Sequence, residues 1–395
     1  MLKSFRVNNF KSLINIDFRP SGLNLLIGPN NSGKTNLCSA INFLSWTSKA
    51  PLDNAIEFAT GETWNISNVY VKDDILEIEI GCLLPYENFK IQFDYILRLL
   101  VNKDYITGKQ SLILKEEVLK ASGCGFDQTV LIENNNGNVK LLNESDLFKN
   151  LIPRTETFFS PTDSTVLLRL FDLETSRCAN IFKKYLQSWG YFNFNLSSIR
   201  YHGVIPGGPL FSNGTNLNLV LFTLHNENPR LEKKIIEALR ILEPKLDYFT
   251  FMSPKPDTIY FFMEDINHNK FSPQSISDGT LRYLAMIYLI YSAACSEDSN
   301  LIKPLYIIEE PENGIYVGHL KPLFEKIDPS GKCGQFIFTT HNPYIIDLFD
   351  SNLDGIHLMK PGNISSILIK PDVDKIKKLL DKFPLGELHF KEMLS

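Results

Sequence analysis

One short stretch constrains this chain more than any other. Residues 28–35 read Gly-Pro-Asn-Asn-Ser-Gly-Lys-Thr and match the pattern G-x-x-x-x-G-K-[ST]. An apolar, strand-like run at 23–27 precedes the pattern, and a helical pattern at 36–44 follows it. The apolar face of that predicted helix consists of Leu37, Ala40, Ile41 and Leu44. A chance glycine-rich turn would not need both flanking elements, so we interpret the stretch as a phosphate-binding P-loop.

The P-loop predicts a role for its residues. Gly28 and Gly33 permit backbone conformations and close approaches that a side chain would block. The N–H groups of the turn and of the helix N-terminus present positive partial charge to a triphosphate. Lys34 is expected to reach the β- and γ-phosphates, and the Thr35 hydroxyl to ligate Mg²⁺. The predicted nucleotide-binding residues of the P-loop are Asn30, Asn31, Ser32, Gly33, Lys34 and Thr35.

Composition narrows the class of protein. The 395 residues are 44% hydrophobic and 22% charged, which is typical of a globular chain. The net charge of −5 provides no global basic field for nucleic acid. No C-x-x-C pair, signal-peptide core or run of about 18 apolar residues occurs. We therefore expect a reduced, cytoplasmic protein with no zinc site and no contact with a membrane. Its six cysteines are scattered: Cys38, Cys82, Cys124, Cys178, Cys295 and Cys333.

The expected fold is one discontinuous α/β domain with two insertions. Residues 1–60 and 271–395 are predicted to form the nucleotide-binding core, with two strands at its start beside the P-loop strand. Residues 61–145 alternate apolar and polar side chains and carry a hairpin signal at 135–138, which predicts an antiparallel β arm. Residues 146–270 are expected to be mainly helical and to lead back to the core.

Two helix boundaries are marked in the sequence. Asn228 and Pro229 predict a helix start, and Pro244 predicts its end. Asp372 predicts the cap of a short amphipathic helix near the end of the chain. No heptad run supports a coiled coil in the long insertion.

A second apolar strand ends in acids. Residues 305–308 are followed by Glu309 and Glu310. In P-loop proteins an acid at this position holds Mg²⁺, and a neighbouring carboxylate can act as general base on the attacking water. Two acids alone would fit a solvated strand end, but the upstream P-loop favours function. We therefore predict Glu309 as a metal ligand and Glu310 as the catalytic base.

Two further segments belong to the same argument. His341 follows a strand-like run at 335–340, at the ligand edge of a parallel sheet; we predict that it senses the γ-phosphate, although a lone histidine is more often structural. Ser277 or Asp278 would cap the helix beginning near 278, and Gly279 would expose backbone N–H groups. These residues fit a plain cap equally well, but two phosphate-type helix starts suggest a site shared by two protomers.

These motifs, taken in order, resemble a known family. They are similar to the RecF/SMC-related branch of ABC-type ATPases, and more closely to stand-alone AAA ATPases akin to the ATPase half of overcoming-lysogenisation-defect (OLD) proteins. The segments that carry the resemblance are Asn9–Ser12, Gly28–Thr35, Ile276–Thr280, Ile307–Gly314 and Thr339–Tyr344.

The resemblance implies a mechanism. Two ATP molecules, each with Mg²⁺, are held between two head-to-tail protomers. The segment 276–280, which we call the signature segment, contacts the γ-phosphate of the partner's ATP through Ser277 and Gly279, with Asp278 between them. Glu309, Glu310 and His341 match the metal acid, the catalytic carboxylate and the switch histidine. Lys11 stands at the family's basic position near phosphate and is the seventh predicted nucleotide-binding residue, from outside the P-loop, although it could equally be a solvated surface charge.

The chain also departs from the family. Ile315, Tyr316 and Val317 replace the residues that commonly follow the Asn-Gly pair, so the resemblance does not extend to the contacts of that loop with a partner protomer. Residues 342–395 are too short for the Toprim nuclease of OLD proteins, so any nuclease is expected on a separate polypeptide. The glutamine loop has four candidates: Gln92, Gln110, Gln128 and Gln187.

Three functions compete. The first is an ATP-driven switch whose ATP-dependent dimerisation controls DNA engagement or a separate effector, by family analogy in prokaryotic anti-phage defence. The alternative is a RecF-like clamp on double-stranded DNA that acts in repair or maintenance. A transporter's nucleotide-binding subunit is disfavoured by the long insertion between Thr35 and Ser275.

Overall fold

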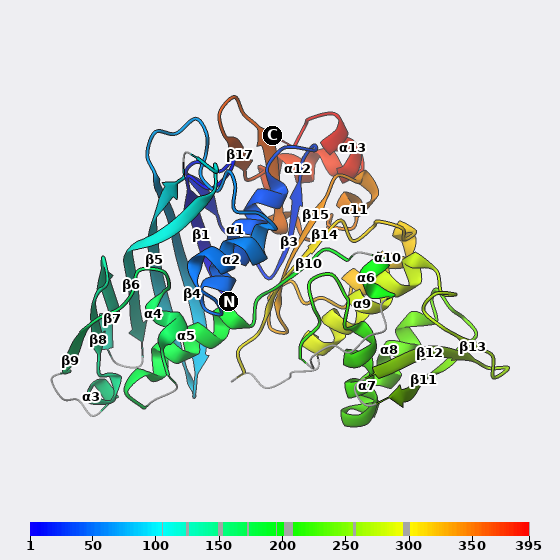
Figure 1. Ribbon diagram of the computed structural model, residues 1–395. Coiled ribbons are helices and arrows are strands. Elements are labelled where there is room, and N and C mark those ends of the chain that lie inside the picture. The colour runs from blue at the N-terminus through cyan, green and yellow to red at the C-terminus, as the bar shows by residue number, and fades with distance from the viewer. Residues whose placement is uncertain are drawn as a thin grey trace.

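The structure is a computed structural model in which three β-sheets organise the chain (Figure 1). It describes residues 1–104, 106–123, 126–148, 153–171, 174–194, 196–200, 208–255, 258–294 and 301–394. Cys124 and Cys295 lie outside the described residues. In Figure 1 the antiparallel sheet lies to the left of the core sheet, and α7, α8 and β11–β13 lie to its right.

The core sheet carries the P-loop. Its first five strands run parallel and the last is antiparallel. Consequently the carboxyl ends of β14, β15 and β3 meet at one edge, where the predicted acids, His341 and the P-loop begin. In spatial order the strands are β10 (Gly190–Phe192), β14 (Leu305–Glu309), β15 (Gln335–Thr340), β3 (Leu23–Ile27), β16 (Ile356–Pro361) and β17 (Ser366–Ile369).

The antiparallel sheet extends beyond the predicted arm on both sides. Its first two strands come from residues expected in the core, and its last strand comes from the segment expected to be mainly helical. The predicted hairpin is present, with Asn135 paired to Asn138. In spatial order the strands are β2 (Ile16–Phe18), β1 (Leu2–Asn8), β4 (Ile75–Tyr86), β5 (Phe89–Lys103), β6 (Gln110–Gly123), β7 (Phe126–Asn135), β8 (Asn138–Leu142) and β9 (Thr155–Phe159).

The third sheet lies within the segment expected to be mainly helical. It consists of β11 (Leu246–Lys255), β12 (Thr258–Asp265) and β13 (Lys270–Phe271). β10 comes from the same segment but joins the core sheet beside β14. The segment 146–270 is therefore mixed in structure, and part of it completes the core. Alternating patterns in its second half were the signal for these strands.

The P-loop helix lies between two sheets. α1 (Lys34–Thr47) is buried along almost its whole length, so the amphipathic face predicted for it is wider in the structure. Leu26 of β3 packs on this side of the core sheet with α1 and the antiparallel sheet, whereas Leu25 and Ile27 pack on the other side. β3 is thus buried on both faces, as expected of a central parallel strand.

The opposite face of the core sheet is covered by α9 (Asp278–Ala294) together with α10 (Val317–Phe324) and α11 (Pro343–Asp347). Gln335 joins the two large sheets, because its side-chain amide exchanges hydrogen bonds with the backbone of Leu2. The position of the site therefore depends on both sheets.

The remaining helices are short. Asn228 caps α8, accepting a hydrogen bond from the Leu231 N–H, and Asp372 caps α12, so both predicted starts are confirmed. α8 ends at Leu239, before the predicted Pro244. These helices are α2 (Leu52–Thr60), α3 (Glu144–Phe148), α4 (Val166–Arg169), α5 (Arg177–Gln187), α6 (Leu196–Ile199), α7 (Leu217–Glu227), α8 (Pro229–Leu239), α12 (Val373–Leu380), α13 (Leu385–Phe390) and the 3₁₀ turns η1 (Glu174–Ser176) and η2 (Leu353–Gly355).

Candidate nucleotide site

The P-loop turn depends on its glycines. Gly28 and Gly33 have φ values of 156° and 98°, and Asn31 also has a positive φ, 63°. A Cβ on Gly28 would lie 2.1 Å from the carbonyl oxygen of Met359, so β16 leaves no room for a side chain. The Nζ of Lys34 donates hydrogen bonds to the carbonyl oxygens of Gly28 (2.7 Å) and Pro29 (3.0 Å), which holds it across the turn.

A cavity of about 490 Å³ opens over this turn at the carboxyl edge of the core sheet. Six of the seven predicted nucleotide-binding residues line it, all except Lys11, together with both predicted acids, Glu309 and Glu310. The structure therefore brings the two halves of the sequence motif to one place. Sequence reasoning missed three further lining residues: Ser12, Asn36 and Thr339.

Two residues from a distant part of the chain contact one carboxylate oxygen of Glu309. The Tyr191 hydroxyl donates to its Oε2 at 3.0 Å, and the Asn193 side-chain amide lies 3.4 Å from the same oxygen. Oε1 is buried and has no hydrogen-bond partner. Burial raises the pKa of the Glu309 carboxyl, whereas the hydroxyls of Tyr191 and Thr35 lower it.

These residues fit Mg²⁺. A buried carboxylate oxygen without a partner is costly unless a ligand satisfies it. Thr35 and Glu309 supply the oxygen donors that Mg²⁺ prefers, and the rest of its coordination ordinarily comes from phosphates and water. Among the residues that the structure describes, no cluster of three or more His, Cys, Asp or Glu side chains could hold a metal.

Lys34 is prepared for an anion. Burial lowers the pKa of its ammonium, and the negative charges of Glu310 and Glu309 raise it. A triphosphate in the cavity would add negative charge and favour the protonated form. The N–H groups of the α1 N-terminus and the Lys34 ammonium are the groups of this cavity that can attract phosphate.

Glu310 is held in a strained conformation. Its φ is +44°, which is rare outside glycine and asparagine, and its N–H donates to the Thr339 carbonyl oxygen at 3.1 Å. The Asn313 side-chain amide donates to its Oε2 at 2.7 Å. The Nδ1 of His341 lies 3.3 Å from its Oε1. The two predicted catalytic side chains are therefore adjacent, but only Glu310 lines the nucleotide cavity, whereas His341 lines a neighbouring cavity bordered by Gly28 and Pro29.

Lys11 is not where the sequence placed it. Its Nζ lies 2.8 Å from Oε1 of Glu62, and it does not line the cavity. The next residue, Ser12, does line it, and its hydroxyl accepts a hydrogen bond from Asn36 at 2.7 Å. The positive φ of Lys11, 49°, turns the chain so that these neighbours point in different directions. The residue of this segment that reaches the cavity is therefore Ser12, the neighbour of the predicted Lys11.

The signature segment lies elsewhere. Ser277 is exposed and caps α9, its hydroxyl accepting a hydrogen bond from the Thr280 N–H at 3.1 Å. Asp278 forms an ion pair with Arg200. A Cβ on Gly279 would lie 2.2 Å from the Gly314 carbonyl oxygen, so glycine is needed there for packing within the chain. None of these residues lines the nucleotide cavity.

Comparison with known proteins agrees with this arrangement. Residues 23–347 match the family model described as "AAA domain, putative AbiEii toxin, Type IV TA system". The chain belongs to this family. The match includes the P-loop strand, the signature segment, both acids and His341. No curated protein matches the chain by sequence.

Solved structures show the fold of this family member. An SMC head bound to the C-winged helix domain of ScpA is similar with a TM-score of 0.54 and 14% identity, over 95% of this chain and 99% of that one. An Smc head from Pyrococcus furiosus, bound to the C-terminal domain of ScpA, gives 0.49 and 11% identity over 96% and 98%. The SMC head of Thermotoga maritima gives 0.41 and 13% over 94% and 99%. The first similarity confirms the predicted fold class, an ABC-type P-loop α/β fold with an antiparallel sheet.

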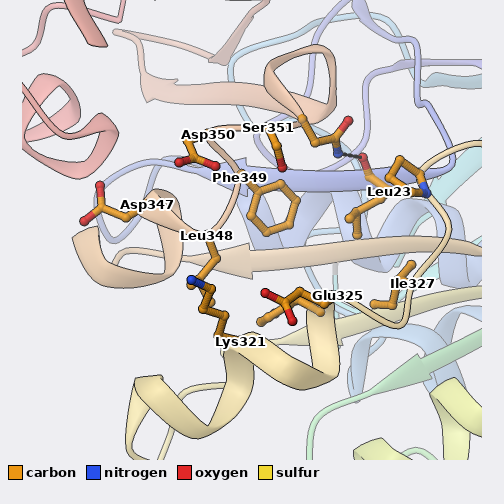
Figure 2. A pocket seen from close by; sticks show the side chains of 12 residues that line it. Leu23, Lys321, Glu325, Ile327, Asp347, Leu348, Phe349, Asp350 and Ser351 are labelled. Atoms are coloured by element: carbon orange, nitrogen blue, oxygen red, sulfur yellow. Dashed lines mark hydrogen bonds between the residues drawn. The ribbon is translucent and has the colours of Figure 1, made fainter. Parts of the chain in front are cut away.

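A second cavity, of about 460 Å³, lies far from this site (Figure 2). It is bordered by Leu23, at the amino end of β3, whereas the P-loop follows the carboxyl end. Figure 2 shows charged side chains around it, including Lys321, Glu325 and Asp350. It contains none of the predicted site residues.

In the part of the chain that the structure describes, no helix is long and apolar enough to cross a membrane.

Proposed function

We propose that this protein is an ATP-hydrolysing switch whose ATP-bound form is a dimer. One observation carries the proposal. The cavity of a single chain contains the P-loop, Glu309 and Glu310, but the signature segment lies outside it with Ser277 exposed. A half-site facing solvent on the same chain as a nucleotide cavity is what a head-to-tail dimer requires, because each protomer then completes the other's site.

The residues of the cavity have separate roles in this proposal. The P-loop backbone and Lys34 bind the phosphates, while Thr35 and Glu309 hold Mg²⁺, which supplies charge neutralisation when it is bound. Glu310 accepts the proton of the attacking water, which positions that water for attack on the γ-phosphorus. His341, next to Glu310, donates a hydrogen bond toward the γ-phosphate. Ser277 and Gly279 of the partner close the site from the other side.

The biological output of the switch follows the family. Its description refers to a putative toxin of a type IV toxin–antitoxin system, which favours an output other than chromosome maintenance. We propose that the switch acts in prokaryotic anti-phage defence, in the manner of an OLD-like ATPase that works with a separate effector or nuclease. The same switch could instead control binding to DNA. In the alternative function, a RecF-like clamp, DNA binding would be its sole output.

Light scattering tests the dimer. The molecular mass of the parent protein and of Glu310→Gln is measured with no nucleotide, with ADP and with ATP, always with Mg²⁺. We expect a doubled mass with ATP, most persistent in Glu310→Gln because bound ATP is not consumed. A monomer under all conditions, in a preparation that still hydrolyses ATP at a rate proportional to protein concentration, would contradict the proposal.

DNA binding separates the two outputs. Binding of a labelled duplex is measured at several salt concentrations with ATP and Glu310→Gln. A clamp predicts ATP-dependent binding with a steep salt dependence, because contacts to phosphates release counterions. Dimerisation with ATP but no duplex binding at low salt would leave a protein effector as the output.

A further inference from the structure

The helix that begins at the signature segment touches the loop that follows the catalytic acids. Arg282, on α9, donates a hydrogen bond from Nη1 to the Asn313 carbonyl oxygen at 2.6 Å. One turn earlier on the same helix, Gly279 packs directly against the carbonyl of Gly314. Loop 310–314 therefore lies against α9 at two points, and a displacement of the helix must displace the loop.

The same loop holds the proposed general base. Asn313 donates from its side-chain amide to Oε2 of Glu310 at 2.7 Å, and its backbone N–H donates to the Glu310 carbonyl oxygen at 3.0 Å. Asn313 is thus shared: its carbonyl oxygen bonds to Arg282 and its amide bonds to Glu310. Asn313 is therefore the single residue that links Arg282, on α9, to the proposed base Glu310.

The other side of the loop is fixed to the core sheet. Glu312 is buried and accepts a hydrogen bond from the Thr340 hydroxyl, at the end of β15. The same hydroxyl accepts a hydrogen bond from the Asn342 N–H at 2.9 Å, which links the two residues that flank His341 in the sequence. The loop is therefore anchored at Glu312, and the Asn313 end is the part that α9 can shift.

We propose that Arg282 and Asn313 are positioning residues that connect each protomer's signature segment to its own Glu310. This inference rests on the proposed function, because only in a shared site does the signature segment touch ATP. That ATP is held by the partner, whereas Glu310 acts on the ATP of its own chain. The connection therefore makes hydrolysis at one site depend on occupancy of the other. Arg282 acts through Asn313 and contacts no reacting atom.

ATP hydrolysis kinetics test the connection. Turnover is measured against ATP concentration for the parent, Arg282→Ala, Arg282→Lys, Asn313→Ala and the double alanine variant, with the exposed Arg19→Ala as control. Arg282→Ala and Asn313→Ala should each lower kcat by about tenfold or more with little change in KM, because binding groups are untouched. Arg282→Lys should restore part of the loss, since an ammonium can still donate to the carbonyl. The Hill coefficient should fall toward 1 in the alanine variants.

The combined variant distinguishes a shared path from general damage. If both residues act through one connection, the double variant should be no slower than the slower single variant, whereas independent effects would multiply. Multiplied effects, or parent-like kcat and Hill coefficient in a folded Arg282→Ala, would overturn the inference. Should Arg282→Ala fail to fold, parent-like kinetics of Asn313→Ala alone would overturn it. A parent that hydrolyses no ATP would instead overturn the proposed function and this inference with it.

Discussion

Two buried carboxylates, one in each large sheet, show how this molecule separates structure from function. Glu117 in the antiparallel sheet accepts hydrogen bonds from the Val166 N–H (2.6 Å), the Leu167 N–H (3.3 Å) and the Tyr95 hydroxyl (3.0 Å). Both of its oxygens are used, and it anchors the start of α4. Glu309 in the core sheet is also largely buried, but its Oε1 has no partner.

The two carboxylates differ in which groups satisfy the hydrogen-bonding capacity of their oxygens. Burial raises the pKa of both groups, so the cost of desolvation is common to them. The protein itself supplies the donors for Glu117, whereas Glu309 faces a cavity that also contains Lys34 and the P-loop. Glu117 is therefore satisfied by its own chain, whereas Glu309 has an oxygen that a bound ligand would satisfy.

The largest expected effect is on ATP turnover and concerns Glu310, at the carboxyl edge of the core sheet. Glu310→Gln should lower ATP turnover by about 10² to 10⁴-fold, the usual contribution of a general base, because an amide cannot accept the proton of the attacking water. Phosphate release at saturating ATP measures the loss, and filter binding should show retained ATP affinity. Turnover at the parent rate would remove Glu310 from the role of base.

At Glu117, in the antiparallel sheet, the expected effect is a dependence of the unfolding free energy on pH. Burial raises the pKa of Glu117 from 4.5 to about 7, so its stabilising contribution is complete below pH 4.5 and is lost as the pH rises through about 7. Glu117→Gln removes this titration. Between these pH values the parent should lose about 3 kcal/mol more unfolding free energy than the variant. Urea denaturation at each pH measures both, and parallel curves would refute the shift.

Lys34→Ala should abolish the stabilisation that ATP gives to the folded protein. A ligand at about 100 times its Kd contributes about 2.7 kcal/mol, which thermal unfolding with and without ATP detects. Lys11→Ala is the matched control, because Lys11 pairs with Glu62 outside the cavity. It should be stabilised as strongly as the parent. Equal stabilisation of Lys34→Ala would mean that Lys34 is not a phosphate ligand.

The smallest effect is expected at the metal acid. Glu309→Gln keeps the shape of the side chain but loses its charge, so Mg²⁺ should strengthen ATP binding less than in the parent. We expect a loss of about tenfold in the Mg²⁺-dependent part of the affinity, about 1.4 kcal/mol. Calorimetric titration of ATP with Mg²⁺ or with EDTA measures this part. An unchanged Mg²⁺ effect would assign the metal to other residues.

Much of the site was predictable because its parts are local. The P-loop needs a strand, a tight turn and a helix in one continuous stretch, and the structure has all three at the predicted positions. The acids and His341 follow apolar strands, and parallel pairing brings such strand ends to one edge. The caps at Asn228 and Asp372 were local for the same reason.

The rest depends on contacts that no local pattern encodes. Tyr191 reaches Glu309 because β10 pairs with β14, although the strands are far apart in sequence. The N-terminal strands alternate as predicted but join the antiparallel sheet, since strand pattern does not specify a partner. None of the four candidate glutamines lines the nucleotide cavity.

The central claim is that one complete site needs two chains. The most direct test mixes two inactive variants, Ser277→Arg and Lys34→Ala, and measures ATP turnover. Their mixed dimer would contain one intact site, formed by the P-loop of the first and the signature segment of the second. With random association, about a quarter of the parent turnover is the upper limit, reached if the two sites act independently; if hydrolysis at one site needs ATP in the other, as inferred above, about tenfold less should return. A mixture that forms mixed dimers, shown by co-purification of differently tagged chains, yet stays as inactive as its components would contradict the account.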